Sequence, residues 1–587
     1  MKILGISGHY HDSAAALLID GLPVAAVQEE RLSRHKNDAG FPLAAIEWCL
    51  DHAGLSPGDL DAVIFYEKPT LKFDRVLTSL LQGWPGSWRS YPKAMKNMLG
   101  EKLWVRGLIA SQLGISTRRV RCIEHHQSHA ATAFLTAPTQ KAAIITADGV
   151  GEWATLTVGM GTKRADGLSE IRMLRELRFP HSLGLFYSAV TAYLGFTVNE
   201  GEYKVMGLAS YGQPTRIEEM RRLLRPAGDG AFTLDLDFFD FLGKVESGYS
   251  GRFIELFGPP RKSWQPIDLR SEEGRRFADI AASAQALLEE VMVGIATSLQ
   301  RETGLSDLCL GGGVALNGVA NARILREAGF ARLFVPSAPG DAGCALGAAL
   351  YADRILFGQP DKAVPDHPFL GPEPDEAALL RIALEDGIPA AASDQLVEDV
   401  ADALAADKIV GWVDGAMEYG PRALGHRSIL AAPHDVAMRD RLNRDIKYRE
   451  EFRPFAPVVA AEHADRFFDL PPGGVRLARF MSGVVPVRPE WRSRLAAVTH
   501  VDGTARVQVL DREMEPRLHA LLEAYGKRSG IPILLNTSFN LAGEPIVNTV
   551  SEAYSTFRRC GIDLLVAGNV CVTKPRVVHA QVLENVA

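Results

Sequence analysis

Residues 1–30 and residues 142–160 follow the same plan, and this repeat limits the folds that the chain can adopt. In the first copy, the apolar runs KILGIS, SAAALLI and PVAAVQEE predict three strands, with a polar loop after the first and an Asp20-Gly21 turn after the second. In the second copy, the strand AAIITA ends at Asp148-Gly149 and the strand ATLTVGM follows the loop. Two copies of strand, polar loop and hairpin predict two similar lobes that enclose one cleft.

Length and composition exclude several classes of protein. The chain has 587 residues, of which 47% are hydrophobic, so it is too long for a small binding module and is not biased towards disorder. The net charge of -7 gives no general attraction to nucleic acid or to anionic lipid, and we expect neither as a partner. The six cysteines form no CxxC pair, and no signal segment or long apolar span is evident, so we expect a cytoplasmic protein.

A proline-rich stretch divides the chain. Residues 357–375 contain five prolines and little periodicity, which favours a domain boundary between residues 1–357 and residues 376–587. Strands alternate with helical segments on both sides of this stretch, for example the helical run 277–299 and the strand PILLN. The sequence therefore predicts an α/β protein with two domains.

A pair of histidines is the first candidate metal site. His125 and His129 in EHHQSHAATAF stand four residues apart, so a helix would place both imidazoles on one face. Asp148 and Asp341 each follow a predicted strand in a glycine-containing loop, where a carboxylate would reach the cleft. Two His and two Asp would suit iron(II), manganese or zinc. The alternative is a pair of solvated histidines at a helix start, and His126 has no predicted task.

Glycine loops suggest a nucleotide site. Gly311, Gly312 and Gly313 follow the strand DLCL and precede a helical pattern, so their backbone N–H groups could approach a phosphate, and Asn317 lies four residues further on. With the duplicated lobes, this pattern favours an actin-like nucleotide cleft. Lys204 lies among glycines in GEYKVMGLASYG, and either a phosphate contact or a solvated surface fits its context equally well.

The second domain carries a basic segment with interleaved apolar residues. Arg422, Arg427 and Arg453 lie beside Gly, Pro or Phe, which suits recognition of a phosphate or carboxylate by forked guanidinium groups. Arg506 and the polar loop LNTSFN could complete a pocket for a small, doubly charged substrate. The alternatives are a solvated helix face and an RNA-binding patch, and the intervening acids argue against RNA.

His11 is a further candidate, because a loop histidine beside Asp12 could act as a general base near neutral pH. The residues alone favour the alternative, a hairpin-loop histidine with a structural hydrogen bond.

These motifs together resemble a known family. GHYHDSAAALLIDG, EERLSRHK, EHHQSHAATAF, GEYKVMGLASYG, GGGVALN, GDAGCALGAA, GPRALGHRS, KYREEFRPFAP, THVDGTARVQ and LNTSFNLAGEPIV occur in the order seen in the bacterial ATP-dependent O-carbamoyltransferases. Members of that family carbamoylate antibiotics such as tobramycin and cephamycins, or nodulation factors. The resemblance runs essentially from end to end.

The resemblance implies a fold and a reaction. It implies a duplicated actin-like (ribonuclease H-like) first domain, similar to the tRNA threonylcarbamoyl-transferring metalloprotein, and a second domain similar to the YrdC-type threonylcarbamoyl-adenylate synthase. Carbamoyl phosphate would lose its phosphate in the second domain, and the carbamate would react with ATP to give carbamoyl-adenylate and pyrophosphate. The first domain would pass the carbamoyl group to a hydroxyl of a small-molecule acceptor and release AMP.

The resemblance also assigns residues. It implies that His11 is the base, and that ATP is a co-substrate beside a divalent metal, iron in the family, with Mg²⁺ as a further candidate. The implied metal ligands are His125, His129, Asp148 and Asp341, and the implied nucleotide-binding residues are Lys204, Gly311, Gly312, Gly313 and Asn317. The implied carbamoyl-phosphate-binding residues are Arg422, His426, Lys447, Arg453, Arg506, Asn536 and Ser538.

Two other functions use the same glycine loops: an actin-like kinase or ATPase with a ligand-sensing C-terminal domain, and a non-catalytic nucleotide-regulated binding protein. The kinase or ATPase would leave the HxxxH pair and the C-terminal arginines without a function. His426 stands where the nodulation branch commonly has asparagine, which favours the antibiotic-type branch, and Ser210 replaces a common proline.

We expect the acceptor to contact the variable segments 73–118 and 214–275. The sequence predicts no oligomeric state.

Overall fold

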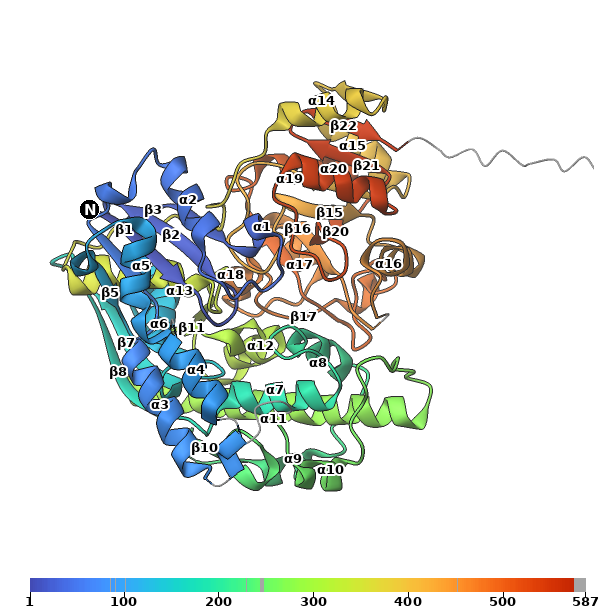
Figure 1. Ribbon diagram of the computed structural model, residues 1–587. Coiled ribbons are helices and arrows are strands. Elements are labelled where there is room, and N and C mark those ends of the chain that lie inside the picture. The colour runs from blue at the N-terminus through green and yellow to red at the C-terminus, as the bar shows by residue number, and fades with distance from the viewer. Residues whose placement is uncertain are drawn as a thin grey trace, which may run out of the picture.

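Three sheets organise the structure (Figure 1). The computed structural model describes residues 1–574 except 85, 90, 101, 229, 243–247 and 451. Two of the sheets have five strands and belong to the N-terminal part of the chain, and the third has eight strands and belongs to the C-terminal part. Helices pack on all three sheets, so the predicted mixed α/β class is confirmed.

The first lobe is built on a sheet with the strand order β3-β2-β1-β4-β5. Strands β1, β2 and β3 form an antiparallel meander, and β4 and β5 continue the sheet in parallel with β1. Residues Ile3, Leu4 and Ile6 of β1 are fully buried, since helices cover both faces of this central strand. The strands are β1 (Lys2–Ser7), β2 (Ala14–Ile19), β3 (Leu22–Gln28), β4 (Ala62–Phe65) and β5 (Val120–Cys122).

The second lobe repeats this topology. Its sheet has the order β8-β7-β6-β11-β12, again an antiparallel meander followed by two strands parallel to the first. The shared topology agrees with the predicted duplication, and it gives both lobes a loop at the end of the first strand, where His11 and Asp148 lie. The strands are β6 (Lys141–Ala147), β7 (Ala154–Lys163), β8 (Ser169–Arg178), β11 (Asp307–Gly311) and β12 (Arg332–Phe334).

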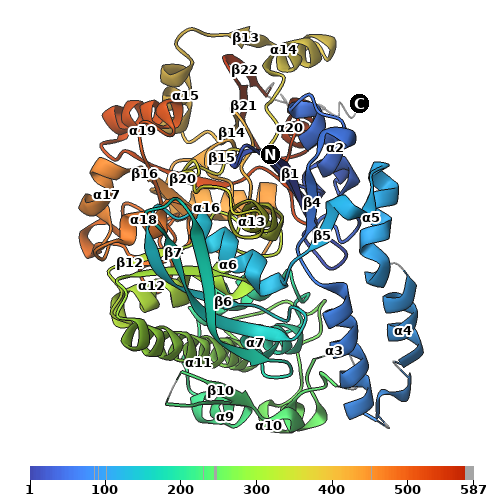
Figure 2. The same cartoon turned by 90° about the vertical axis from the view of Figure 1, so that its left-hand side faces the viewer.

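Two equivalent helices join the lobes. Helix α6 (His125–Leu135) follows the last strand of the first lobe, helix α13 (Gly343–Tyr351) follows the last strand of the second, and the two pack side by side (Figure 2). Their approach depends on Gly347, because a Cβ atom there would lie 2.1 Å from the Ser128 carbonyl oxygen and from Thr132 Oγ1. Thr132 Oγ1 also donates a hydrogen bond of 2.9 Å to the Gly343 carbonyl. This close contact brings the start of α6 next to the start of α13.

A long helix supports the second lobe. Helix α11 (Glu272–Thr303) begins at Ser271, whose side chain accepts a hydrogen bond from the Gly274 amide, and it ends at Gly304 in the left-handed conformation. Its length and composition would allow it to cross a membrane, yet 67% of its most apolar 18-residue stretch is buried inside the fold. It packs against α7 (Leu183–Tyr193), α8 (Glu202–Ala209), α9 (Ile217–Leu223) and α12 (Gly318–Glu327).

The remaining helices of the N-terminal part are short. They are α1 (Glu30–Ser33), α2 (Leu43–His52), α3 (Pro69–Gln82), α4 (Tyr91–Gly100), α5 (Val105–Leu113) and α10 (Gly251–Phe257). A small antiparallel pair, β9 (Leu224–Pro226) and β10 (Phe232–Leu234), lies beside α9.

The C-terminal sheet has the strand order β13-β22-β21-β14-β15-β20-β16-β19. Its side chains alternate between two cores: Trp412 points to helices α15 and α19, whereas Val413 packs with residues of α14 and α20. The strands are β13 (Ala390–Ala392), β14 (Val410–Val413), β15 (Arg427–Ala431), β16 (Ala456–Ala460), β19 (Gln508–Leu510), β20 (Ile533–Ser538), β21 (Leu564–Ala567) and β22 (Val570–Thr573), and the helices are α14 (Glu376–Glu385), α15 (Leu396–Ala405), α16 (Val436–Leu442), α17 (Ala461–Phe467), α18 (Gly474–Ala478), α19 (Pro516–Ser529) and α20 (Val550–Arg559).

The proline-rich stretch holds no helix and no named strand between Leu356 and Glu376. Its backbone bonds to both sides: the Leu370 carbonyl accepts from the Ala26 amide of β3 at 2.8 Å, and the Gly371 amide donates to the Met417 carbonyl at 2.9 Å. The chain therefore crosses from the first lobe to the C-terminal sheet through this segment. The division into domains at 357 and 376 stays a prediction.

Candidate active site and metal centre

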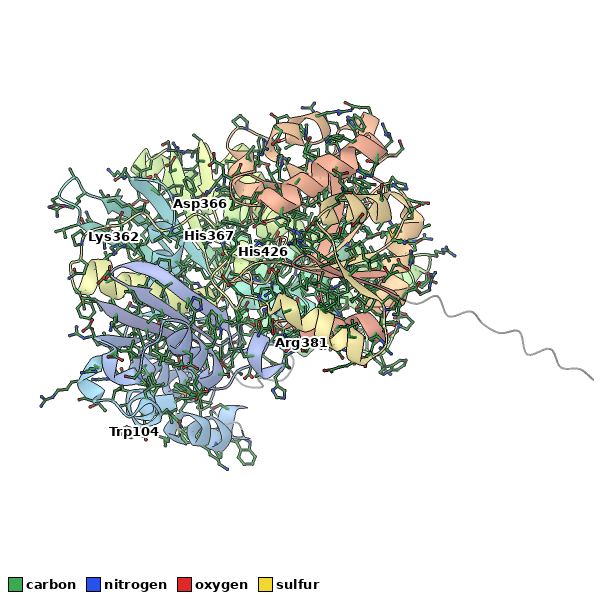
Figure 3. The ribbon with its side chains drawn as sticks, turned by 90° about the horizontal axis from the view of Figure 1, so that it is seen from above. Trp104, Lys362, Asp366, His367, Arg381 and His426 are labelled. Atoms are coloured by element: carbon green, nitrogen blue, oxygen red, sulfur yellow. The ribbon has the colours of Figure 1, made fainter. Side chains whose placement is uncertain are left out.

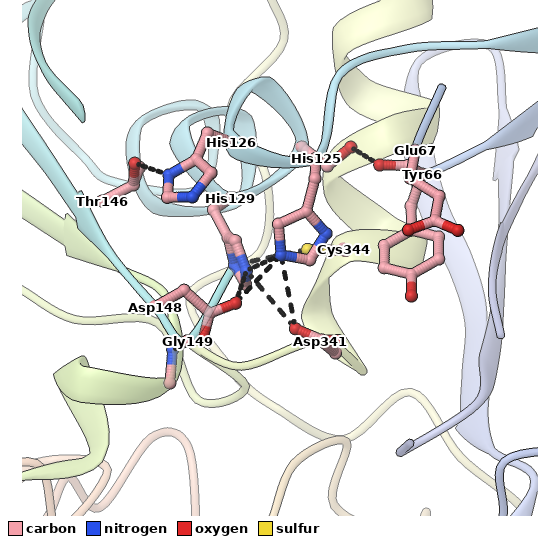
Figure 4. Close-up of polar contacts among 12 residues, drawn as sticks. Tyr66, Glu67, His125, His126, His129, Thr146, Asp148, Gly149, Asp341 and Cys344 are labelled. Carbon is pink, nitrogen blue, oxygen red and sulfur yellow. Dashed lines mark hydrogen bonds and ion pairs between the residues drawn. The ribbon is translucent and has the colours of Figure 1, made fainter. Parts of the chain in front are cut away.

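Four predicted metal ligands meet at one point (Figure 4). His125 and His129 come from the first turns of α6, Asp148 from the end of β6, and Asp341 from the loop before α13. The Nε2 atoms of the two histidines are 3.1 Å apart. Asp148 Oδ2 lies 2.9 and 3.3 Å from these nitrogens, and Asp341 Oδ1 lies 3.6 and 3.5 Å from them.

These separations fit a bound divalent cation. With ligand bonds of about 2.1 Å, neighbouring donors are about 3.0 Å apart around an octahedral ion and about 3.4 Å apart around a tetrahedral one. Asp341 is 2% exposed, and its Oδ1 atom has no hydrogen-bond partner among the described residues. A buried carboxylate oxygen without a hydrogen bond is costly, and a cation between the four side chains would satisfy it. The donor set of two nitrogens and two oxygens is one that transition metals accept.

Neighbouring side chains hold the histidine rings in place. We call the position between His125 Nε2, His129 Nε2, Asp148 Oδ2 and Asp341 Oδ1 the four-donor point. The Sγ atom of Cys344 lies 3.3 Å from Nδ1 of His129, the ring nitrogen that points away from the four-donor point. His126 faces a different partner, Thr146, with 2.6 Å between Nδ1 and Oγ1. Burial lowers the pKa of His126 to about 3, so this ring is neutral. His126 therefore acts as a packing residue next to the site.

His11 lies at the edge of the same centre. Its Nδ1 is 3.0 Å from Asp12 Oδ2, and its Nε2 is 3.8 Å from Asp341 Oδ2. Burial lowers the pKa of His11, but the carboxylates of Asp341 and Asp12 outweigh burial and raise that pKa to about 9. A cation beside Asp341 would cancel part of this negative charge and oppose the rise.

The glycine triplet divides into two roles. Gly312 has a φ of 91°, and a Cβ atom there would lie 2.2 Å from the Ala147 carbonyl oxygen, so this glycine is required for close packing against β6. Gly313 lines the central cavity and donates from its amide to Asp148 Oδ1 at 3.1 Å. Gly311 and Gly312 do not line the cavity. The helix does not follow directly, because a 3-10 turn (Gly313–Leu316) intervenes and α12 begins at Gly318.

Asn317 closes that turn. Its Oδ1 accepts from the Ala320 amide at 3.1 Å and so caps α12, and its Nδ2 donates to Gln285 Oε1 at 2.9 Å. Tyr187 donates its hydroxyl proton to the same Gln285 oxygen at 2.8 Å. Asn317, Gly313 and Tyr187 thus line one polar wall of the cavity between the two lobes.

Lys204 faces the C-terminal part of the cavity. Its Nζ donates to Glu450 Oε1 at 3.0 Å, so in this structure it is paired with a carboxylate rather than with the glycine loop.

Four guanidinium groups line the same cavity, and of these only Arg453 has an ion pair among the described residues, with Glu450. They belong to Arg422, Arg449, Arg453 and Arg506. Burial lowers the pKa of Arg422 to about 10 and that of Arg449 to about 9. Burial and the charges of Arg422 and Arg449 lower the pKa of Arg506 well below its usual value. Among the described residues, the side chains of Arg422 and Arg506 have no hydrogen bond or ion pair, and Arg506 Nε is fully buried. Such a cluster is unfavourable unless an anion joins it.

Lys447 completes the positive wall. Its Nζ donates to the carbonyls of Ser538 and Asn540 and lies 2.9 Å from Asn540 Oδ1. Asn536 donates from Nδ2 to Gln508 Oε1 at 2.6 Å, and its Oδ1 is buried without a partner among the described residues. All of the predicted anion ligands except His426 line the cavity; they are Arg422, Lys447, Arg453, Arg506, Asn536 and Ser538.

His426 does not join this group. Its ring stacks on Phe369 of the proline-rich stretch with 3.8 Å between centroids, its Nε2 is 3.1 Å from Glu515 Oε2, and it does not line the cavity. Figure 3 labels His426 together with His367 of the same stretch. Its neighbour Arg427 is also elsewhere: it is fully buried and donates to backbone carbonyls, including those of Asn548 and Pro372. The prediction that Arg427 binds an anion is wrong. Its guanidinium donors are occupied by backbone carbonyls, so Arg427 stabilises the local fold instead.

Three residues near these sites escaped prediction. Cys344 sits within GDAGCALGAA, where nothing distinguishes a residue that contacts His129 from an ordinary buried thiol. Arg449 belonged to the basic segment but not to the predicted ligands, and its spacing from Lys447 could have indicated it. Tyr203 precedes Lys204, and its contact with Arg453 in the distant C-terminal part has no sequence signal.

One cavity of about 810 Å³ contains these groups. It is lined by His11, Asp148 and Asp341 and also by Arg422 and Arg453, so the carboxylates of the candidate metal centre and the arginine cluster face the same space.

Comparison with known proteins gives the family. Residues 2–350 match the family described as Carbamoyltransferase N-terminus, and residues 401–574 match Carbamoyltransferase C-terminus. An uncharacterized protein (sll1178) of Synechocystis sp. is 41% identical over 97% of this chain and 96% of its own length. Nodulation protein NolNO of Sinorhizobium fredii is 37% identical over 96% of this chain and 79% of its own length. The 3'-hydroxymethylcephem-O-carbamoyltransferase of Amycolatopsis lactamdurans is 35% identical over 45% of this chain and 48% of its own length. The chain therefore belongs to the carbamoyltransferase family and is a transferase.

Proposed function

We propose that this carbamoyltransferase forms carbamoyl-adenylate at the arginine cluster and transfers the carbamoyl group to an acceptor hydroxyl beside His11. Carbamoyl phosphate and water give carbamate and phosphate, and carbamate and ATP then give carbamoyl-adenylate and pyrophosphate. In the last step the acceptor oxygen bonds to the carbamoyl carbon, the bond to the AMP oxygen breaks, and AMP leaves. This proposal divides the chain into a transfer domain, residues 1–357, and a YrdC-like adenylate-forming domain, residues 376–587.

The guanidinium cluster, in which Arg422 and Arg506 have no partner among the described residues, is the observation that carries the proposal. Carbamoyl phosphate is a small dianion, and four partly buried guanidinium groups supply the charge and the N–H donors that such a ligand requires. Arg422 and Arg506 have free donors, and Asn536 and Ser538 add short polar groups at the end of β20. A general basic surface for nucleic acid would be exposed rather than enclosed in a cavity.

The proposed transfer centre uses the other end of the cavity. His125, His129, Asp148 and Asp341 would hold a divalent cation, for which we propose iron(II), with manganese and zinc as alternatives. When bound, such a cation supplies positive charge for the phosphate group of the departing AMP. Gly313 and Asn317 would contact the nucleotide between the lobes, close to those carboxylates. His11 would accept the proton of the acceptor hydroxyl at Nε2, while Asp12 orients the ring through Nδ1.

The kinase alternative has less support, since phosphoryl transfer from ATP gives no task to the arginine cluster. The acceptor would be a small molecule of the antibiotic type. We propose that the protein acts in the cytoplasm, with no nucleic acid and no membrane among its partners.

Product analysis tests this function. With ATP, carbamoyl phosphate and a panel of polyols, we expect pyrophosphate, phosphate and AMP in equal amounts, together with a carbamoylated acceptor. Release of ADP together with a phosphorylated acceptor would contradict the proposal and favour the kinase.

A further inference from the structure

Helix α8 of the second lobe reaches into the arginine cluster. Tyr203 and Lys204 lie in its first turn, and both line the part of the cavity that holds Arg453 and Glu450. The guanidinium carbon of Arg453 is 4.7 Å from the centroid of the Tyr203 ring. A side chain from the N-terminal part of the chain thus contacts a predicted anion ligand of the C-terminal part.

Little else holds the Arg453 side chain. Among the described residues, its guanidinium makes no hydrogen bond, and its one ion pair is with Glu450 at 3.6 Å between Nη1 and Oε2. Glu450 is itself bound by Lys204 of α8, at 3.0 Å between Oε1 and Nζ. Tyr203 and Lys204 of α8 thus contact Arg453 and Glu450 of the C-terminal part, and Arg453 and Glu450 contact each other.

The cation–π contact suits anion binding. An aromatic ring attracts the guanidinium without accepting conventional N–H···O hydrogen bonds, so N–H donors remain for an oxyanion. The ring also restricts the rotamers of a long side chain, which lowers the entropy lost when the anion binds. A hydrogen-bonded carboxylate in place of the ring would instead compete with the substrate for the N–H groups.

We propose that Tyr203 is a positioning residue for Arg453, so that helix α8 of the N-terminal part completes the carbamoyl phosphate site of the C-terminal part. This inference rests on the proposed function. It makes the first reaction step dependent on contact between the two parts of the chain, and it gives GEYKVMGLASYG a role besides the nucleotide.

Graded variants of Tyr203 in the full-length enzyme test the inference. Tyr203→Leu removes the π face, whereas Tyr203→Phe keeps it. We expect Tyr203→Leu to raise the KM for carbamoyl phosphate and the Kd for inorganic phosphate by about tenfold, and Tyr203→Phe to stay within about twofold of the wild type. The KM for ATP should change less than about twofold in both. Trp264→Leu is the matched control. Trp264 is exposed outside the cavity, and the Nζ atom of Lys262 lies 5.4 Å from its ring centroid, so this variant removes a cation–π pair that is not at the site.

Tyr203→Met is a second variant for the case that leucine lowers the melting temperature. A flexible thioether fills the volume without a π face, so the same rise in KM is expected. The inference is wrong if both variants bind phosphate like the wild type, or if the KM for ATP rises in place of the KM for carbamoyl phosphate. A wild-type enzyme without carbamoyl-phosphate-dependent pyrophosphate release would instead contradict the proposed function, and phosphate binding would still report on Tyr203.

Discussion

Replacement of Arg422 by methionine should stabilise the ligand-free protein and remove its response to phosphate. Burial lowers the pKa of Arg422 from 12.5 to about 10, and no described residue pairs with its guanidinium. At about 1.4 kcal/mol per pKa unit, this shift sets the cost of the buried charge at about 3 kcal/mol. Methionine keeps the unbranched shape without the charge, and relaxation around the site reduces the gain to about 1–2 kcal/mol. For a unit the size of the proposed C-terminal domain, 376–587, the melting temperature should rise by about 2–8 °C.

The assay compares thermal unfolding in two buffers. In a buffer free of phosphate and sulfate, Arg422→Met should unfold at a higher temperature than the wild type. Phosphate at about 100 times its Kd should then stabilise the wild type by about 2.7 kcal/mol and leave the variant almost unchanged, so the order of the two proteins reverses.

Arg528→Met is the control. Its guanidinium is exposed and pairs with Asp402 and Glu398, so this variant should gain no stability and should keep the phosphate response. Arg422 is not an anion ligand held at a cost in stability if Arg422→Met is less stable than the wild type without anions, or if phosphate stabilises both proteins equally.

Three further changes have distinct outcomes. His11→Ala should abolish transfer and leave pyrophosphate release measurable, whereas equal loss of both would contradict its role as base. Cys344→Ala should weaken metal binding by about 10- to 100-fold in a chelator competition, since the His129 ring loses its outer partner; unchanged affinity would show that the contact is incidental. Gly347→Ala should destabilise the fold by about 2–3 kcal/mol in chemical denaturation, because its Cβ would lie 2.1 Å from Ser128 O. Gly294→Ala, with no atom within 4 Å of the new Cβ, is the matched control and should not destabilise α11.

The strands and the metal-centre residues were predictable because each has a local signal. The alternation in residues 1–30 and 142–160 indicated the two meanders, and β1 and β6 begin and end within one residue of the expected runs. The HxxxH spacing needs only one helix, Asp148 directly follows β6, and Asp341 lies in the loop after β12. Because β6, β11 and β12 run parallel in one sheet, their carboxyl ends share one edge, and this brings the two aspartates close together.

Contacts between segments that are distant in sequence were not predictable from local patterns. His426 turns away from the cavity because Phe369 and Glu515 hold its ring, and both partners are distant in sequence. Arg427 and Arg453 both lie in loop-like basic sequence. Arg427 is nevertheless buried and donates to backbone carbonyls, whereas Arg453 lines the cavity. The contact between Tyr203 and Arg453 depends on how the second lobe meets the C-terminal sheet, and no spacing within either segment encodes it.

Exchange of labelled pyrophosphate into ATP tests adenylate formation most directly, because only an adenylating step that releases pyrophosphate reversibly can label ATP. We expect exchange that requires carbamoyl phosphate, continues without any acceptor, and is lost in Arg453→Ala. An enzyme that transfers the carbamoyl group without carbamoyl-phosphate-dependent exchange, or that releases ADP instead, would contradict it.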